Sequence, residues 1–207
     1  NEEGNGYSGW RYGIKPGDSD TSVTGWMVLA LKSAKMADLK IPQRCWDGAK
    51  ALFDQMTATT GGYPKTGYQR PGGANARLRS RARFVLNPSM DAINIMSQIF
   101  MGTKPGGTLN SQAGEITTPE NLPTADDPNK VDHYYWYYAS LAMFQMGGSY
   151  WKTWEKPMFA TIAGTQNREG DVTHKKHGSW DPIGCWGPCG GRVYSTAINC
   201  LTLEVYY

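Results

Sequence analysis

The chain has 207 residues, of which 40% are hydrophobic and 19% are charged, and its formal net charge is +3. This composition is typical of a folded domain with a hydrophobic core, and it excludes disorder and a coiled coil. The net charge is too small for a dedicated nucleic-acid-binding protein. No apolar run reaches the roughly 20 residues that a membrane-spanning helix needs. We therefore expect a single domain over residues 1–207, with no nucleic-acid partner and no membrane span.

Apolar residues recur every three or four positions in six segments, and this pattern predicts six helices. The segments are 23–35, 42 to the glycine pair at 61–62, 88–101, 131–146, 151–165 and 193–207. A weaker pattern predicts a short helix within 105–114 or 119–121. No segment alternates with period two for long enough to predict a strand. The sequence therefore predicts an all-α fold, and its fourth helix, apolar on all sides, is expected to lie between layers.

Aromatic residues flanked by glycine precede several of these helical blocks and mark an internal repeat. Trp10, Tyr63 and Trp180 are separated by 53 and 117 residues, and the second interval is close to twice the first. The unit between them, near 114–130, lacks its aromatic turn. The repeat divides the chain into units of about 7–60, 61–113, 114–177 and 178–207. A period in the fifties with two helices per unit predicts stacked helical hairpins.

Three segments carry a resemblance to a known family: GDSDTSVTGW at 17–26, YYWYYA at 134–139 and GGRVYSTA at 190–197. They resemble the prenyltransferase and squalene-oxidase repeat, the unit of the terpene-cyclase-like α/α toroid. More narrowly, the chain is similar to uncharacterised exported repeat proteins of planctomycete-type bacteria. The resemblance covers nearly the whole chain and implies inner and outer helices around a central hollow. About three and a half hairpins are present, where a closed ring takes about six or seven, so it implies an open, incomplete ring.

The compartment and the chain ends give weaker expectations. Four cysteines, many Trp and Tyr residues and polar loops favour an exported, extracytoplasmic protein. The first residues show no signal-peptide pattern, so we expect any signal peptide to have been removed or not included, and the last predicted helix lacks a capping Gly or Pro. We therefore expect either a fragment of a longer protein or an open arc.

The resemblance brings three activities with it, and each requires residues that can be sought in the sequence. Class II cyclases of this family protonate an alkene with the middle Asp of an Asp-x-Asp-Asp-Thr motif, and Ser19 occupies that place here. A serine hydroxyl cannot act as that acid, and Asp20 and Ser22 are instead expected to cap the next helix. The Asp-x-Cys zinc pair of protein prenyltransferases and the Cys-Gly-Glu-Gln run of thioester proteins are absent. The sequence therefore predicts no catalytic residue.

One cluster has the composition of a metal site. His174 and His177 precede Cys185 and Cys189, and imidazoles and thiolates at short spacing suit zinc. A disulfide between Cys185 and Cys189, across a Trp-Gly-Pro turn, is a second interpretation. Two thiols with solvated histidines are the third. All three interpretations stay open on the sequence, and beyond this zinc site no cofactor is expected.

Two groups of residues are candidates for contact with a partner or ligand. Arg77, Arg79, Arg81 and Arg83 alternate, so an extended conformation would place four guanidinium groups on one side. Such groups bind phosphate or carboxylate, as in an anionic polymer or an acidic protein, although a solvated loop is the plainer interpretation. Trp136 and Tyr137, on the aromatic helix, are the second group.

The function predicted from these observations is that of a non-catalytic exported scaffold. It would bind a protein or polymer through its open edges and concave face, as part of an assembly with other subunits or copies of itself. The alternative is an enzyme acting on an isoprenoid or a polysaccharide, whose cations or sugar rings the aromatic interior would contact. A carboxylate held in the concave face would favour the enzyme, and the candidates are Asp18, Asp20, Asp181 and Glu204.

Overall fold

The computed structural model describes residues 9–14, 17–74, 87–128 and 130–206. It is 58% helical, which confirms the prediction of a predominantly helical chain. Its α-helices are α1 (Thr21–Met36), α2 (Gln43–Met56), α3 (Ser89–Phe100), α4 (Gly107–Ile116), α5 (His133–Met146), α6 (Gly148–Thr165) and α7 (Gly187–Leu203). Two short 3-10 helices, Pro119–Asn121 and Glu204–Tyr206, and two strands complete the described elements.

A short β-hairpin stands where the sequence predicted the end of the second helix. Strand β1 (Thr57–Thr60) pairs antiparallel with β2 (Tyr63–Thr66), and Thr57 lies opposite Thr66. Gly61 and Gly62 form the two-residue turn, with φ of +67° and +89°. This left-handed backbone matches the twist of a two-residue hairpin and favours glycine. The prediction of a helix up to the glycine pair is therefore wrong for residues 57–60.

Two other segments can be compared with their predicted helix bounds. The weakly predicted short helix within 105–114 exists as α4, and residues 119–121 form a 3-10 turn. Helix α7 begins at Gly187, six residues earlier than predicted, but Gly191 has φ +70° and ψ −175° and breaks its regular geometry. Regular helix therefore starts only after that kink, close to the predicted start at 193.

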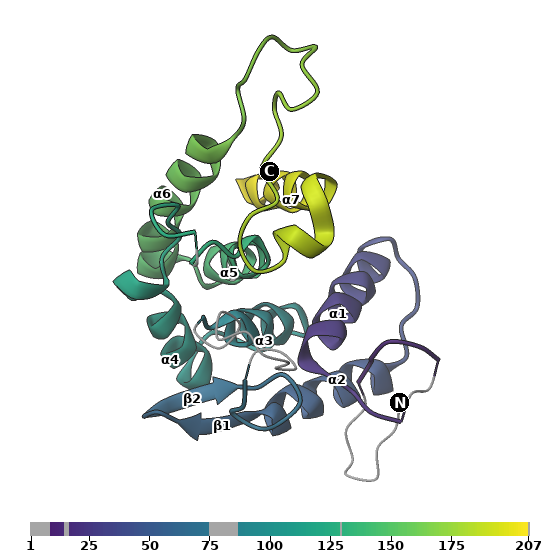
Figure 1. The fold of residues 1–207 in the computed structure, drawn as a ribbon. Coiled ribbons are helices and arrows are strands. Elements are labelled where there is room, and N and C mark those ends of the chain that lie inside the picture. The colour runs from purple at the N-terminus through teal and green to yellow at the C-terminus, as the bar shows by residue number, and fades with distance from the viewer. Residues whose placement is uncertain (1–8, 15–16, 75–86, 129, 207) are drawn as a thin grey trace.

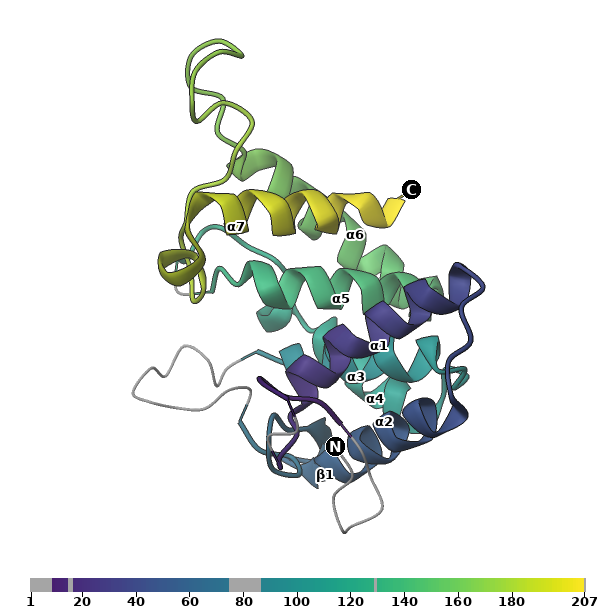
Figure 2. The ribbon, with the colours of Figure 1, turned by 90° about the vertical axis from the view of Figure 1, so that its right-hand side faces the viewer.

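The odd-numbered helices form a row. Helix α3 packs against both α1 and α5, and α5 packs against α7. Helices α2, α4 and α6 each pack against the odd-numbered helix that precedes them in the chain. Figures 1 and 2 show α1, α3, α5 and α7 lying alongside one another, with their first residues toward the same end of the molecule. We call these four the inner helices and the other three the outer helices.

Helix α5 lies at the centre of the core, as its sequence predicted. It is bordered by α3, α6 and α7, and nine of its residues are buried, among them Trp136, Tyr138 and Met143. The indole N–H of Trp154 on α6 donates to Ser140 Oγ at 2.9 Å, so these two buried polar groups are paired.

Within the described residues, no helix combines the length and the apolar character needed to cross a membrane.

Candidate functional site

A hollow lies where the four inner helices begin, and we call it the inner cavity. Its volume is about 740 Å³, within the range of about 300–1,000 Å³ that is common for small-molecule sites. All four inner helices contribute residues from or next to their first two turns. The lining residues are Arg11, Tyr12, Ser22, Val23, Trp26, Tyr68, Asn87, Ser89, Met90, Asp132, Tyr134, Trp186, Cys189, Gly190 and Tyr194.

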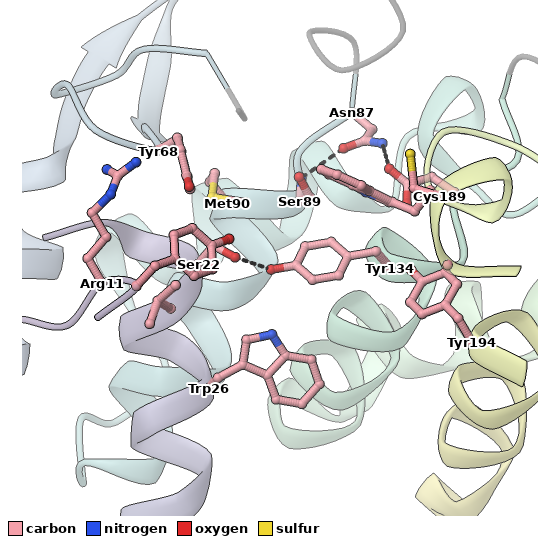
Figure 3. A pocket seen from close by; sticks show the side chains of 15 residues that line it. Arg11, Ser22, Trp26, Tyr68, Asn87, Ser89, Met90, Tyr134, Cys189 and Tyr194 are labelled. Carbon is pink, nitrogen blue, oxygen red and sulfur yellow. Dashed lines mark hydrogen bonds between the residues drawn. The ribbon is translucent and has the colours of Figure 1, made fainter. Parts of the chain in front are cut away.

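A hydrogen bond crosses the inner cavity between two helices. Ser22 Oγ on α1 and Tyr134 Oη on α5 are 2.5 Å apart, although 112 residues separate them in the chain. Figure 3 shows these side chains pointing toward each other, with Arg11 and Tyr68 on one side and Tyr194 and Cys189 on the other. Burial raises the pKa of Tyr134 above its usual value, so its phenol stays protonated at neutral pH.

Aromatic rings form much of the wall. Trp26 stacks on Tyr137, with 5.8 Å between ring centroids, and meets the edge of Tyr138 at 5.4 Å. The ring centroids of Tyr134 and of Trp186, at the start of α7, are 6.1 Å apart. These contacts hold the rings in fixed positions, so the cavity presents apolar faces whose orientation is set before any ligand arrives.

Asp132 is the carboxylate in the wall of the inner cavity. It caps α5 by accepting from the Tyr135 backbone N–H at 3.1 Å, and it accepts from Asn87 Nδ2 at 2.7 Å. The oxygen of the same Asn87 amide accepts from the Ser89 backbone N–H at 3.2 Å, at the start of α3. Asp132 is buried, and the loss of solvent raises its pKa despite these donors.

Asn87 and Asp132 also border a second, smaller hollow of about 180 Å³. It is lined in addition by Tyr135, Trp136 and Cys185, and by acidic and amide side chains of the segment before α5. The Asn87–Asp132 hydrogen bond thus forms part of the wall between the two hollows.

A second buried carboxylate lies behind the opposite wall. Asp20 caps α1 by accepting from the Val23 N–H at 2.7 Å, and Tyr68 Oη donates to it at 3.2 Å. Arg11 Nη1 is 3.9 Å from Asp20 and 3.2 Å from Asp18. Burial raises the pKa of Asp20, and its hydrogen bonds and Arg11 oppose that shift. Asp20 therefore orients two side chains of the wall, Tyr68 and Arg11.

The structure places the predicted partner-binding residues apart. Arg77, Arg79, Arg81 and Arg83 lie outside the described residues. Trp136 is buried in the core, in edge contact with the His133 ring at 5.3 Å between centroids, and it lines the smaller hollow rather than the inner cavity. Tyr137 is buried, and its ring stacks on Trp26, which lines the inner cavity.

The four residues of the predicted zinc site are not gathered in one place. His174 is exposed on the loop between α6 and α7, whereas Cys185 is buried beside the Val131 carbonyl. Among the described residues, no group of three or more His, Cys, Asp or Glu side chains could hold a metal ion. Cys185 and Cys189 are both thiols here, and Cys189 is exposed on the inner cavity. Their pairing stays a prediction.

Most of the acidic candidates do not converge in the cavity. Asp181 pairs with Arg192 and is more than half exposed, and Glu204 is exposed. Ser19, which takes the place of the cyclase acid in the resemblance, is buried but does not line the cavity. Asp20 alone of the four carboxylates is desolvated, and it acts as the helix cap that the sequence predicted.

Several lining residues were missed in the sequence, and most share a simple signal. Tyr134 and Tyr194 lie within the first two turns of helices whose starts the sequence predicted closely. Four parallel helix starts bring such residues together in a hairpin array. Asn87 carries the weaker signal of an amide directly before Pro88. Its partner, Asp132, is 45 residues away, and no spacing rule connects the two.

Comparison with family models, with curated proteins and with solved structures gave no match for this chain.

Proposed function

We propose that the chain is a non-catalytic binding protein whose inner cavity takes a segment of an extended polymer, most simply a glycan. One observation carries this proposal: a cavity of about 740 Å³ joins fixed aromatic rings with hydroxyl, amide and carboxylate groups. Aromatic faces pack on the C–H faces of sugar rings, and the polar groups hydrogen-bond the hydroxyls.

The arrangement of helices supports the finer fold that the resemblance implies. Four inner helices lie parallel in a row, and the first three each pack against an outer helix, which is the packing expected of part of an α/α toroid. We propose that the chain forms an open arc of such hairpins, with the cavity on its inner side. An extracytoplasmic location is part of the same proposal, because extracellular polymers are then accessible.

The exposed face of the last inner helix supports the proposed assembly with other subunits or copies. Val193 is 83% exposed and Leu201 is 40% exposed, both on α7. Apolar residues along one exposed helix face are typical of contact surfaces. Light scattering of the purified chain tests this part: we expect a species larger than one chain, and a stable monomer would contradict it.

A second candidate function, an enzyme acting on a polysaccharide or an isoprenoid, is favoured by one observation. Asp132 lines the cavity with a raised pKa, and Asp20 is buried behind Tyr68. A carboxyl group with a raised pKa can act as a general acid. Both carboxylates, however, are engaged as helix caps, which favours binding over catalysis.

The test of binding uses xylohexaose, cellohexaose and chitohexaose with isothermal titration calorimetry. We expect saturable binding of at least one, weakened roughly 10-fold in Trp26→Ala, because that ring offers an open aromatic face. Trp151→Ala on outer helix α6 is the matched control, and we expect its affinity to stay within about 2-fold of the parent protein. If no oligosaccharide binds, or both variants bind like the parent, the proposal is wrong.

The same oligosaccharides, together with squalene, distinguish catalysis from binding. Each is incubated with the protein and analysed by mass spectrometry. Recovery of the intact compounds is expected from a binding protein. Products that disappear in Asp132→Asn would replace our proposal with the enzyme.

A further inference from the structure

A third hollow lies on another part of the molecule, and we call it the outer groove. Its volume is about 450 Å³, and it is bordered by α2, the β-hairpin, α3 and α4, which lie together in Figure 1. It shares no lining residue with the other two hollows. Its lining residues are Lys50, Asp54, Thr57, Ala58, Thr59, Pro64, Asn94, Gln98, Thr103, Gly106, Thr108 and Leu109.

Asn94 lines this groove, and its buried side-chain oxygen has no hydrogen-bond donor within the described part of the chain. Asn94 is 2% exposed, and its Nδ2 donates to Gln112 Oε1 at 2.9 Å. Among the described residues, nothing donates to Asn94 Oδ1. Buried carbonyl groups in native proteins are almost always paired, so this oxygen is an acceptor that a molecule bound in the groove can use.

The surrounding network fixes the orientation of this amide. Gln112 Nε2 donates to Thr66 Oγ1 at 2.9 Å and to Asp91 Oδ1 at 3.2 Å. Asp91 Oδ1 also accepts from the Thr66 backbone N–H at 2.6 Å, so it is an acceptor whatever the protonation of the carboxyl group. The oxygen of Gln112 must therefore face Asn94, and the Asn94 nitrogen must face Gln112. Exchanging the Asn94 oxygen and nitrogen would place two acceptors against each other.

The charges beside Asn94 compensate each other. Lys50 Nζ contacts Gln98 Oε1 at 3.2 Å and Asp54 Oδ2 at 3.4 Å. Gln98 Nε2 donates to Asp54 Oδ1 at 2.8 Å, and Thr103 Oγ1 donates to Gln98 Oε1 at 2.9 Å. One cation and one anion thus share the groove, which favours neither an anionic nor a cationic ligand.

The groups left over define what a ligand must offer. Asn94 Oδ1 requires a donor, whereas the ammonium of Lys50 has three N–H groups and uses two of them within the chain. The exposed hydroxyls of Thr59 and Thr108 both donate and accept. A neutral molecule with several hydroxyl groups satisfies all of these groups at once. We propose that the outer groove is a second binding site, for a polyol or sugar, with Asn94 Oδ1 as its buried acceptor.

The experiment is a titration of the ¹⁵N-labelled protein, followed by NMR, with glycerol, D-glucose and myo-inositol. We expect at least one probe to cause saturable shifts in the amides of residues 57–59, 94, 98 and 106–109. The side-chain amide of Asn94 should move with them, because its oxygen gains a donor.

Thr108→Val removes one rim hydroxyl without touching the core, and we expect the affinity to fall about 3- to 10-fold, as for one neutral hydrogen bond. Thr153→Val, on the exposed side of α6, is the matched control and should leave the affinity unchanged. Asn94→Leu should abolish the binding, and its spectrum shows whether the variant is folded.

Two outcomes would overturn the proposal. Shifts that rise linearly with concentration and are equal in Thr108→Val mean that only water occupies the groove. Shifts confined to residues around Ser22, Tyr134 and Gly190 would support the inner cavity and leave the outer groove without a ligand. The two sites are thus judged independently in one spectrum.

Discussion

Helix α3 borders two hollows, and comparing them shows two ways of building a site. Ser89 and Met90, at its start, line the inner cavity, whereas Asn94 and Gln98 line the outer groove. In the inner cavity, the carboxylate and amide groups mostly hold helix starts in place, and the ligand-facing surface is aromatic. In the outer groove, side-chain amides and hydroxyls bond to one another. The polar groups of the inner cavity therefore also stabilise the helix starts, whereas those of the outer groove mainly position one another.

This difference predicts the effects of mutation. A change in the wall of the inner cavity should affect stability as well as binding, because the same groups cap helices. A change at the rim of the outer groove should affect binding alone. The substitutions below test this contrast, beginning with the largest expected effect.

Asp132→Ala should have the largest effect. It removes the cap of α5 and leaves the Asn87 amide without its acceptor, at a cost of about 2–4 kcal/mol in the free energy of unfolding. Asp132→Asn keeps an oxygen for the Tyr135 N–H and should cost clearly less. Urea unfolding measures both. Equal losses for the two variants would show that Asp132 is not acting as a cap.

Gly25→Ala tests the close approach of two inner helices. A Cβ at Gly25 would lie 2.4 Å from Cγ2 of Ile93 on α3, so we expect a loss of about 1–3 kcal/mol. The matched control is Gly164→Ala on outer helix α6, where a Cβ meets nothing within 4 Å. That variant should gain about 0.5–1 kcal/mol from helix propensity. Thermal or urea unfolding checks both signs, and a neutral Gly25→Ala would contradict the close packing of α1 on α3.

The sequence predicted the inner helices better than the sites between them. Apolar periodicity locates α1, α3 and α5 within two residues at each end, because each buries a face that repeats every three or four residues. The Asp20 cap was predicted because a capping residue and its target N–H are three residues apart. Such signals can be read from a single sequence because the residues involved are close together in the chain.

The contacts that form the two sites join segments that are distant in the sequence, and these were not predicted. Ser22 meets Tyr134 across 112 residues, and Asn94 meets Gln112 from another helix. No pattern within either segment specifies its partner. The β-hairpin was missed for a different reason: four residues per strand are too few for a period of two to stand out. The glycine pair between the strands was its one clear signal.

Two buried groups predict opposite pH dependence. Burial raises the pKa of Asp91 from 3.8 to about 7, so the folded state retains a proton that the unfolded state loses. This group lowers stability as pH rises from about 4 to 7. Burial lowers the pKa of His133 from 6.5 to about 4, so the unfolded state binds the extra proton, and this group lowers stability as pH falls through the same window.

The two contributions are separated by substitution. Asp91→Asn should remove a slope of up to about 1.4 kcal/mol per pH unit, so that stability falls less, or begins to rise, between pH 4 and 7. His133→Gln should make the fall steeper. Urea unfolding at several pH values gives both slopes. Parallel curves for the two variants and the parent would mean that neither group titrates as its burial requires.

Asp54→Asn should have the smallest effect on stability. It allows the same substitution, Asp to Asn, to be compared in the outer groove and in the inner cavity. Asp54 and Lys50 form an exposed pair at 3.4 Å, and such pairs contribute about 0–1 kcal/mol. The new amide can still accept from Gln98 Nε2, so we expect less than about 1 kcal/mol of destabilisation in urea. Asp132→Asn should cost more, because its new amide nitrogen faces the Asn87 donor in a buried wall. Equal costs at the two sites would mean that the Asp132 carboxylate contributes no more to the stability of the fold than the Asp54 carboxylate does.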